Sequence, residues 1–288
     1  MDTSKIAFDV PSEPSEHYVD PGGVAAFALA INDDNPRYAD GRAVPPTYAA
    51  VPGLPAFWAS AELPAQALVD GRGAGHGEHD LYIHKLPEPG TVLTTTASVA
   101  SAVVNRAGMN VFRRVASVDE AGDLVYEQFW STMFVGPVTG GNAGRALDPH
   151  LFGPDAQART REVGTRALPT TADQTFRYGG ASGDRSIIHM DDRAARITMR
   201  SERGKIMQGL GTLGVASRAL VELTAGGDPT RIRRIAVRFS RQAYPGDDVV
   251  VSVYDAGPAA DGRHAYAFEA AAGGQDVLKH GLVEVVPG

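Results

Sequence analysis

The strongest constraint on the fold of this chain is a repeat inside its own sequence. Residues 30–40 (AINDDNPRYAD) align without a gap on residues 181–191 (ASGDRSIIHMD), and Asp33 falls on Asp184 in this alignment. Self-similarity at a fixed offset is typical of a chain built from repeated copies of one structural unit. We therefore expect two related halves.

A second pair of segments supports the duplication. Residues 83–99 and 237–255 lie at nearly the same offset, and each combines a polar, basic stretch with a Pro-Gly turn and a β-branched run typical of a strand. Residues 138–170 are rich in Gly, Pro and charge without a sustained period, which indicates a linker. The expected units are therefore a degenerate repeat at 1–137, this linker, and a catalytic repeat at 171–288.

Each half places helical residues before its strands, an order that fits an α+β fold. The run from Gly209, GLGTLGVASRALVEL, has apolar residues mostly at helical spacing, whereas Pro52, Gly53 and Pro55 would break or kink a helix over 44–62. A short helix is expected over 155–163. Runs rich in Val, Thr, Phe and Tyr predict strands at 80–86, 91–104, 109–118, 123–136, 232–241, 247–255, 263–272 and 276–286.

The candidate chemical centre is a carboxylate and an imidazole. Asp184 and His189 stand five residues apart, and such a pair can move a proton and activate water. Ser-Gly-Asp is also common turn chemistry, and a single His after two isoleucines is often a core residue. The helix expected from Gly209 favours the chemical interpretation, because free N–H groups at a helix N-terminus can stabilise the oxyanion of a polarised carbonyl.

These parts follow the pattern Ser-Gly-Asp-x-Asn-Pro-aliphatic-His-x-Asp, with His-Gly opening a long helix about twenty residues later. The matching residues are Ser182, Gly183, Asp184, Ile188, His189, Asp191 and Gly209. In this the chain resembles the MaoC-like, (R)-specific enoyl-CoA hydratase family. The resemblance implies a double hot-dog fold, in which each of two tandem repeats wraps an antiparallel sheet around a long helix. It also implies a hydro-lyase that hydrates trans-2-enoyl thioesters or dehydrates (3R)-hydroxyacyl thioesters, with no cofactor.

Three positions depart from the family pattern. Ser186 stands where the family has Asn, Ile187 where it has Pro, and Gln208 where it has His. Ser and Gln still form hydrogen bonds, so we expect Ser186 and Gln208 to tune substrate binding or rate. In the N-terminal copy Tyr38 occupies the position of His189, and a phenol that titrates near pH ~10 is a poor proton carrier at neutral pH.

The resemblance implies a mechanism for the C-terminal copy. The Gly209 N–H would bind the thioester carbonyl, while Asp184 and His189 hold one water, one of them acting as base toward C3 and the other supplying the proton at C2. The broken helix of the first half would leave room for the acyl chain. Its apolar residues are expected either to line that tunnel or to be ordinary core residues; they are Tyr48, Leu54, Phe57 and Trp58.

Two alternatives stay open. Ser186 and Gln208 would also suit a non-catalytic subunit that binds acyl thioesters. Arg185 would suit a hydratase or dehydratase of a short or dicarboxylic thioester such as mesaconyl-CoA, because a guanidinium pairs well with a substrate carboxylate.

Composition limits the partners that the chain can bind and the cellular compartment in which we expect it. A formal charge of −7 argues against a nucleic-acid surface, and a chain without Cys has neither disulfides nor zinc-thiolate sites. We assign no metal to His76 and His79, because a strand sends residues three apart to opposite faces. No apolar run could span a bilayer and the first residues lack a secretion signal, so we expect a cytoplasmic protein without membrane contact.

The expected partner is an acyl-CoA or acyl-carrier thioester. Two basic clusters are candidates for its phosphates or equally ordinary solvated faces: Arg200, Arg203 and Lys205, and Arg231, Arg233, Arg234 and Arg238. A monomer and a homodimer formed through exposed edges or helices are both compatible with two repeats in one chain.

Overall fold

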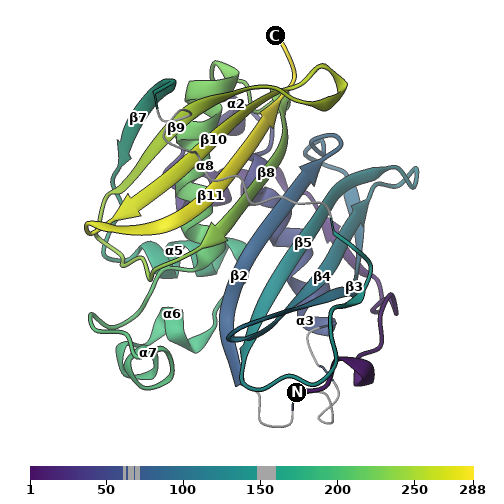
Figure 1. Cartoon of the computed structure of the whole chain (residues 1–288). Coiled ribbons are helices and arrows are strands. Elements are labelled where there is room, and N and C mark those ends of the chain that lie inside the picture. Colours follow the sequence, from purple (N-terminus) through teal and green to yellow (C-terminus); the bar gives the residue numbers. More distant parts are fainter. Residues whose placement is uncertain (61–62, 64–67, 69–71, 148–159) are drawn as a thin grey trace.

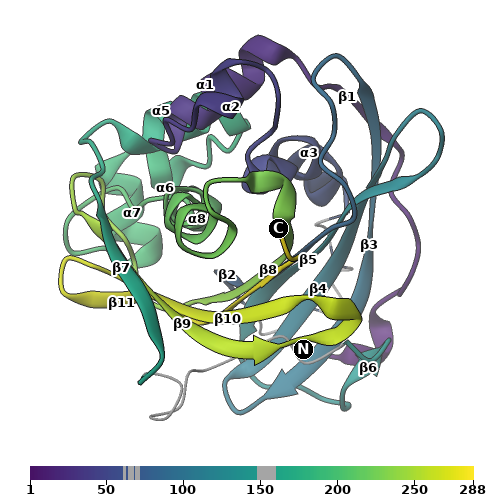
Figure 2. The same ribbon diagram turned by 90° about the horizontal axis from the view of Figure 1, so that it is seen from above.

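The computed structural model describes residues 1–60, 63, 68, 72–147 and 160–288. One antiparallel sheet dominates it, and the sheet curves around the helices (Figures 1 and 2). Its strands are β1 (Ser15–Tyr18), β2 (Arg72–Ile83), β3 (Val92–Asn105), β4 (Gly108–Val118), β5 (Leu124–Val135), β6 (Ala143–Gly144), β7 (Glu162–Leu168), β8 (Ile232–Phe239), β9 (Val249–Pro258), β10 (His264–Ala272) and β11 (Gln275–Val285).

The order of the strands repeats itself about the centre of the sheet. The sheet runs β1-β3-β4-β5-β2-β8-β11-β10-β9-β7, with β6 paired to β3. From the central pair outward, one half runs β2-β5-β4-β3-β1 and the other runs β8-β11-β10-β9-β7. In each half the second and third strands form a hairpin, a long strand follows, and a short strand forms the edge. This arrangement is a double hot-dog fold of the α+β class, as expected from the repeat.

The two halves join where β2 pairs with β8. Asp80 on β2 lies directly opposite Ala236, and its carboxylate receives two hydrogen bonds from Arg234, at 3.0 and 2.8 Å. Both side chains are buried, and Arg234 also bonds to Glu284 at 3.3 Å. Removing Arg234 would leave the Asp80 carboxylate buried without this partner. The Arg234 guanidinium, counted above among candidates for a phosphate site, is therefore structural.

The helices cover the concave face of the sheet (Figure 2). They are α1 (Pro21–Ala30), α2 (Pro36–Ala39), α3 (Ala50–Ala59), α5 (Gln174–Ser182), α6 (Ile187–Met190), α7 (Asp192–Met199) and α8 (Gly209–Ala225). The central helix α8 ends at Gly226, whose φ of 64° closes it in a left-handed cap. Side chains such as Leu213 and Leu220 are fully buried, and each contributes roughly 1.5–3 kcal/mol of hydrophobic stabilisation.

The helix α3 corrects the expected break, while the alternative of a kink stays a prediction. It runs unbroken through Pro52, Gly53 and Pro55, although it is shorter than α8. Pro52 lies in the first turn, where its missing N–H costs nothing, and Pro55 deprives only one carbonyl of its helical partner. Gly53 allows close packing on β5, because a Cβ there would lie 2.8 Å from Gln128 Nε2.

The strand predictions are confirmed, with β2 beginning earlier than expected and β1 and β7 added. The segment expected as a linker, 138–170, contains β6 and β7, because β7 completes the edge of the second half by pairing with β9. Most of the helix expected over 155–163 lies outside the described residues, and its end is part of β7. The boundaries of the two repeats stay a prediction.

In the described part of the chain, every helix is too short or too polar to cross a bilayer. The expected cytoplasmic location and the oligomeric state stay predictions.

Candidate active site

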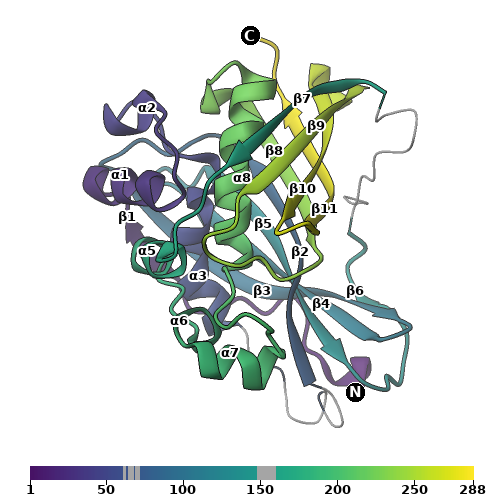
Figure 3. The ribbon, with the colours of Figure 1, turned by 90° about the vertical axis from the view of Figure 1, so that its left-hand side faces the viewer.

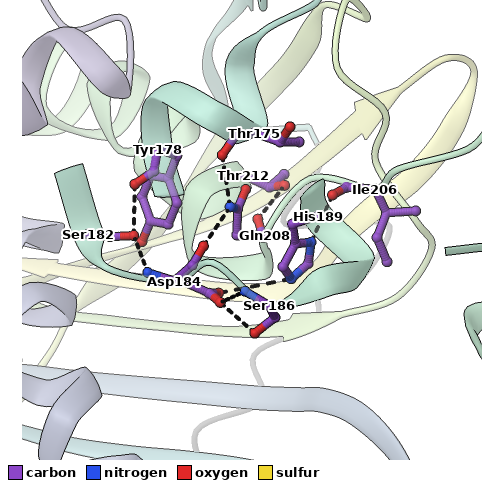
Figure 4. Close-up of polar contacts among 9 residues, drawn as sticks. All are labelled: Thr175, Tyr178, Ser182, Asp184, Ser186, His189, Ile206, Gln208 and Thr212. Atoms are coloured by element: carbon purple, nitrogen blue, oxygen red, sulfur yellow. Dashed lines mark hydrogen bonds and ion pairs between the residues drawn. The ribbon is translucent and has the colours of Figure 1, made fainter. Parts of the chain in front are cut away.

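The candidate acid–base pair consists of Asp184, in the loop between α5 and α6, and His189 on α6 (Figure 4). Helix α5 ends at Gly183, whose φ of 85° turns the chain so that Asp184 follows directly. The Asp184 Oδ1 atom accepts hydrogen bonds from the backbone N–H of Ser186 at 3.2 Å and from its hydroxyl at 2.7 Å. These two bonds fix the carboxylate and leave Oδ2 directed toward His189.

His189 lies on the short helix α6 with only 8% of its surface exposed. Its Nδ1 lies 2.8 Å from the carbonyl oxygen of Ile206. Since a carbonyl can only accept, Nδ1 carries the proton, and Nε2 of the neutral ring is free to accept one. Burial lowers the pKa of His189 below its ordinary value, against the opposing effect of Asp184, so the ring is neutral at neutral pH.

The two groups are placed so that both can bond to one oxygen atom beside them. Asp184 Oδ2 and His189 Nε2 are 3.9 Å apart, which is too long for a direct hydrogen bond. An oxygen placed beside both atoms can bond to each at an ordinary distance of about 2.8 Å. The pair is therefore arranged to hold a water molecule or a substrate hydroxyl.

Gly209 opens α8 and lines the same cavity. Its N–H belongs to the first turn, where backbone donors have no acceptor within the helix. A Cβ at this position would lie 3.3 Å from the ring of Phe239, so the contact with that ring favours glycine. The geometry brings a backbone donor and the Asp184–His189 pair to one cavity.

Gln208 lies behind the loop that contains Asp184, and its expected effect on substrate binding or rate stays a prediction. Its side chain is 1% exposed and is absent from the cavity lining of the described residues. The Nε2 amide donates to the carbonyls of Thr175, at 3.0 Å, and Asp184, at 3.1 Å. It therefore ties the loop of Asp184 to α5 from outside the cavity lining, whereas Ser186 does line the cavity.

The cavity has a volume of about 1220 Å³ and runs between the sheet and the helices α3, α6 and α8. One part of its wall is apolar: Leu54, Phe57 and Trp58 of α3 face it together with Trp130 of β5. Phe57 and Trp130 stack with ring centroids 4.7 Å apart. These residues come from the N-terminal repeat, while the acid–base pair comes from the C-terminal repeat.

Two residues expected at the substrate lie elsewhere. Tyr48 is packed in the core against Phe27, and its hydroxyl lies 2.9 Å from Nε2 of His17. Arg185 follows Asp184, is exposed, and is not among the described residues that line the cavity. In a tight turn, adjacent side chains point in different directions, which sequence spacing alone did not resolve.

His76 is a cavity residue that the sequence analysis considered only as a metal ligand. Its ring stacks on Trp130, with centroids 5.6 Å apart, and contacts Phe239 at 4.6 Å. Burial lowers the pKa of His76 to about 4, so the ring is neutral. The Gly on each side of His76 in the sequence was the available signal that backbone and ligand approach closely there.

The equivalent loop of the first repeat is closed. Asp33 is 5% exposed, and burial raises its pKa to about 6. Tyr38, at the position of His189, is 1% exposed, and burial raises the pKa of its phenol. A small separate pocket lies beside Asp33 and is lined by polar residues of α2 and α8.

Solved structures support the fold. The chain superposes on the crystal structure of a MaoC-like dehydratase from Phytophthora capsici with a TM-score of 0.83 and 22% identity, covering 100% of both chains. A Mycobacterium tuberculosis protein described as having a double hotdog fold matches with a TM-score of 0.62 and 14% identity, over 98% of this chain and 96% of that one. The fold and the cavity thus define a double hot-dog protein.

Sequence comparisons establish the family. The profile of the MaoC like domain matches residues 155–271. The 3-hydroxyacyl-thioester dehydratase Y of M. tuberculosis is 31% identical over 277 residues, which are 92% of this chain and 89% of that protein. The chain therefore belongs to the MaoC-like dehydratases, a family of hydro-lyases.

Proposed function

We propose that this chain reversibly hydrates trans-2-enoyl thioesters to (3R)-hydroxyacyl thioesters, carried on coenzyme A or an acyl carrier protein. The observation that carries the proposal is the 3.9 Å gap between Asp184 Oδ2 and His189 Nε2, in a cavity that also contains the first N–H of α8. The name of the 31% identical relative, a 3-hydroxyacyl-thioester dehydratase, supports the same reaction class.

In the hydration direction, Asp184 Oδ2 accepts a hydrogen bond from the water and His189 Nε2 takes its proton. The water oxygen bonds to C3, and the electrons of the C2–C3 double bond move toward the thioester carbonyl. The Gly209 N–H stabilises the oxyanion of this enolate, an effect worth on the order of 3 kcal/mol for one good donor. The imidazolium then gives its proton to C2, which restores the neutral ring.

The acyl chain fits the apolar wall of the cavity. We place it against Leu54, Phe57, Trp58 and Trp130, so the N-terminal repeat would supply the acyl site and the C-terminal repeat the chemistry. The dicarboxylic alternative has less support, because Arg185 is exposed and is not among the described residues that line the cavity.

The test is the loss of enoyl-thioester absorbance when the protein meets crotonyl-CoA, a longer trans-2-enoyl-CoA and mesaconyl-CoA in turn. We expect turnover of at least one monocarboxylic substrate with a (3R) product. Because the His189 base must be neutral, kcat/KM should fall on acidification through a pKa below the usual histidine value of 6.5. Binding of the acyl-CoAs without any turnover, or a (3S) product, would refute the proposal.

A further inference from the structure

One end of the cavity is built from the end of α7 and the loop that follows β8. Gln242 Nε2 donates to the carbonyl of Met199 at 2.8 Å, which joins the two segments. The backbone N–H of Ser240 donates to Val277 of β11 at 2.9 Å, so the loop is also fixed to the sheet. Figure 3 shows α7 below α5 and α6, at about the level that the lower end of β2 reaches.

Three arginines gather at this end. Arg238 and Arg241 line the cavity, and Arg200 follows Met199 directly at the C-terminus of α7. We call these three residues the arginine rim. The bond between Gln242 and Met199 is what brings Arg200 beside the loop that contains Arg241.

The positive charges of the arginine rim are not fully balanced by neighbouring carboxylates among the described residues. All three side chains are exposed, and among the described residues none of them has an ion pair or a side-chain hydrogen bond. By contrast, nearby Arg203 forms two hydrogen bonds to Asp247, at 2.5 and 2.8 Å. One carboxylate, Glu78, lies opposite Arg238 in the β2–β8 ladder, so the rim keeps a net positive charge in a chain whose overall charge is −7.

The position of the rim relative to the reaction centre limits what it can bind. Phe239 lies between the two cavity-lining arginines, and its ring would be 3.3 Å from a Cβ at Gly209. This one segment therefore reaches from the carbonyl site to the open end of the cavity. The acyl chain is assigned to the apolar wall formed by α3 and Trp130. The rim lies away from this wall, so we place the group on the other side of the thioester sulfur against the rim.

We propose that the arginine rim binds phosphate groups on the pantetheine arm of the carrier. The inference rests on the proposed function, since it assumes that a thioester occupies the cavity. Coenzyme A and acyl carrier proteins share this chemistry, because both carry a phosphate at the end of pantetheine. Guanidinium groups suit it, since they bind phosphate oxygens in a bidentate manner and stay charged at all working pH values.

Three crotonyl thioesters test the site: crotonyl-pantetheine, crotonyl-pantetheine 4′-phosphate and crotonyl-CoA. We expect KM to fall roughly ten-fold on adding phosphate, with little change in kcat, and the gain to shrink in high salt because exposed charges are screened. A gain at the 4′-phosphate would place the contact on the group that both carriers share. A gain seen only with crotonyl-CoA would place it on the nucleotide phosphates. Equal KM values for all three would overturn the proposal.

Variants locate the effect. The combined substitutions Arg200→Gln, Arg238→Gln and Arg241→Gln should raise KM for crotonyl-CoA about ten-fold and leave crotonyl-pantetheine unchanged. Arg106→Gln is the matched control, because Arg106 is an exposed cavity-lining arginine on the β3–β4 turn of the other repeat. If the control has the same effect, or if both substrates change alike, the rim is not the phosphate site.

A separate readout distinguishes this proposal from the proposed function. If no thioester is turned over, the proposed function fails, and equilibrium binding of free coenzyme A to the wild-type protein and the triple variant decides the rim alone. Weaker binding to the triple variant, with unchanged binding to Arg106→Gln, would support the phosphate site. Equal binding to all three proteins would overturn it.

Discussion

The two copies of the Asp-containing loop have the same turn and different surroundings. In the first repeat Asp33 Oδ1 accepts the N–H of Asn35 at 3.0 Å, and in the second Asp184 Oδ1 accepts the N–H of Ser186 at 3.2 Å. Each turn leads into a four-residue helix, α2 or α6. The aspartate therefore has a structural role in both repeats, and the turn alone does not define a catalytic site.

The two loops differ in their access to the large cavity and in one side chain, which is His189 in the second repeat and Tyr38 in the first. Asp184 lines a large cavity and faces an imidazole, whereas Asp33 is buried and shares its surroundings with the enclosed phenol of Tyr38. The comparison teaches that the fold keeps the turn, while chemistry requires the cavity and the histidine as well.

The largest expected effect separates the two loops directly. His189→Ala and Asp184→Asn should each lower kcat about 10²- to 10⁴-fold, because they remove the base or the group that orients the water. Tyr38→Phe, at the equivalent position, should leave kcat unchanged. Steady-state kinetics with the best enoyl thioester measures this, and comparable losses in all three variants would show that the loops do not differ as described.

A smaller loss is expected at the start of α8. Gly209→Ala should reduce kcat roughly 10- to 100-fold, because its Cβ contacts the Phe239 ring and shifts the N–H that stabilises the oxyanion. Gly180→Ala is the control, since a Cβ at this helical glycine of α5 meets no atom within 4 Å. If both variants keep full kcat, the oxyanion site lies elsewhere.

The free energy of unfolding should depend on pH through Asp33 of the N-terminal repeat. The buried Asp33 has a raised pKa of about 6, so the free energy of unfolding falls as pH rises from 3.8 to about 6 and then stays constant. Asp33→Asn should therefore stabilise the protein by about 1–3 kcal/mol at pH 8 and give no such gain near pH 4. Urea unfolding at both pH values tests this, with Asp40→Asn, an exposed carboxylate of the same loop, as control. A gain of equal size at both pH values would contradict the assignment.

The smallest effect concerns the residue after each turn. Ser186→Ala removes the hydroxyl bond to Asp184 and should lower kcat about 3- to 10-fold, as expected for one hydrogen bond. Asn35→Ala removes a bond to the Gly227 carbonyl and the N-cap bond that Asn35 accepts from the N–H of Arg37. It should lower the unfolding free energy by about 1–3 kcal/mol without changing kcat. Kinetics and denaturation of both variants test whether Ser186 affects kcat and Asn35 affects the unfolding free energy, or the reverse.

Much of the architecture could be predicted from the sequence. The duplicated segments predicted two repeats, and β-branched runs located most strands, because both signals are local. Helix α3 was harder, since whether a proline breaks a helix depends on its position in the turn and on what packs against it. The positions of Tyr48, Arg185 and Gln208 outside the described cavity lining could not be predicted, because the direction of a side chain is set by tertiary packing. His76 was missed because its neighbours in the cavity come from β5 and the end of β8.

The pairing of β2 with β8 has a consequence for how the molecule folds. Asp80 and Arg234 are separated by 154 residues, so the contact that unites the sheet must wait for a very long loop to close. Until then both strands present unpaired edges, which can associate with other chains. We expect slow refolding, with a yield that falls as the protein concentration rises. The rate of refolding should be limited by the pairing of β2 with β8.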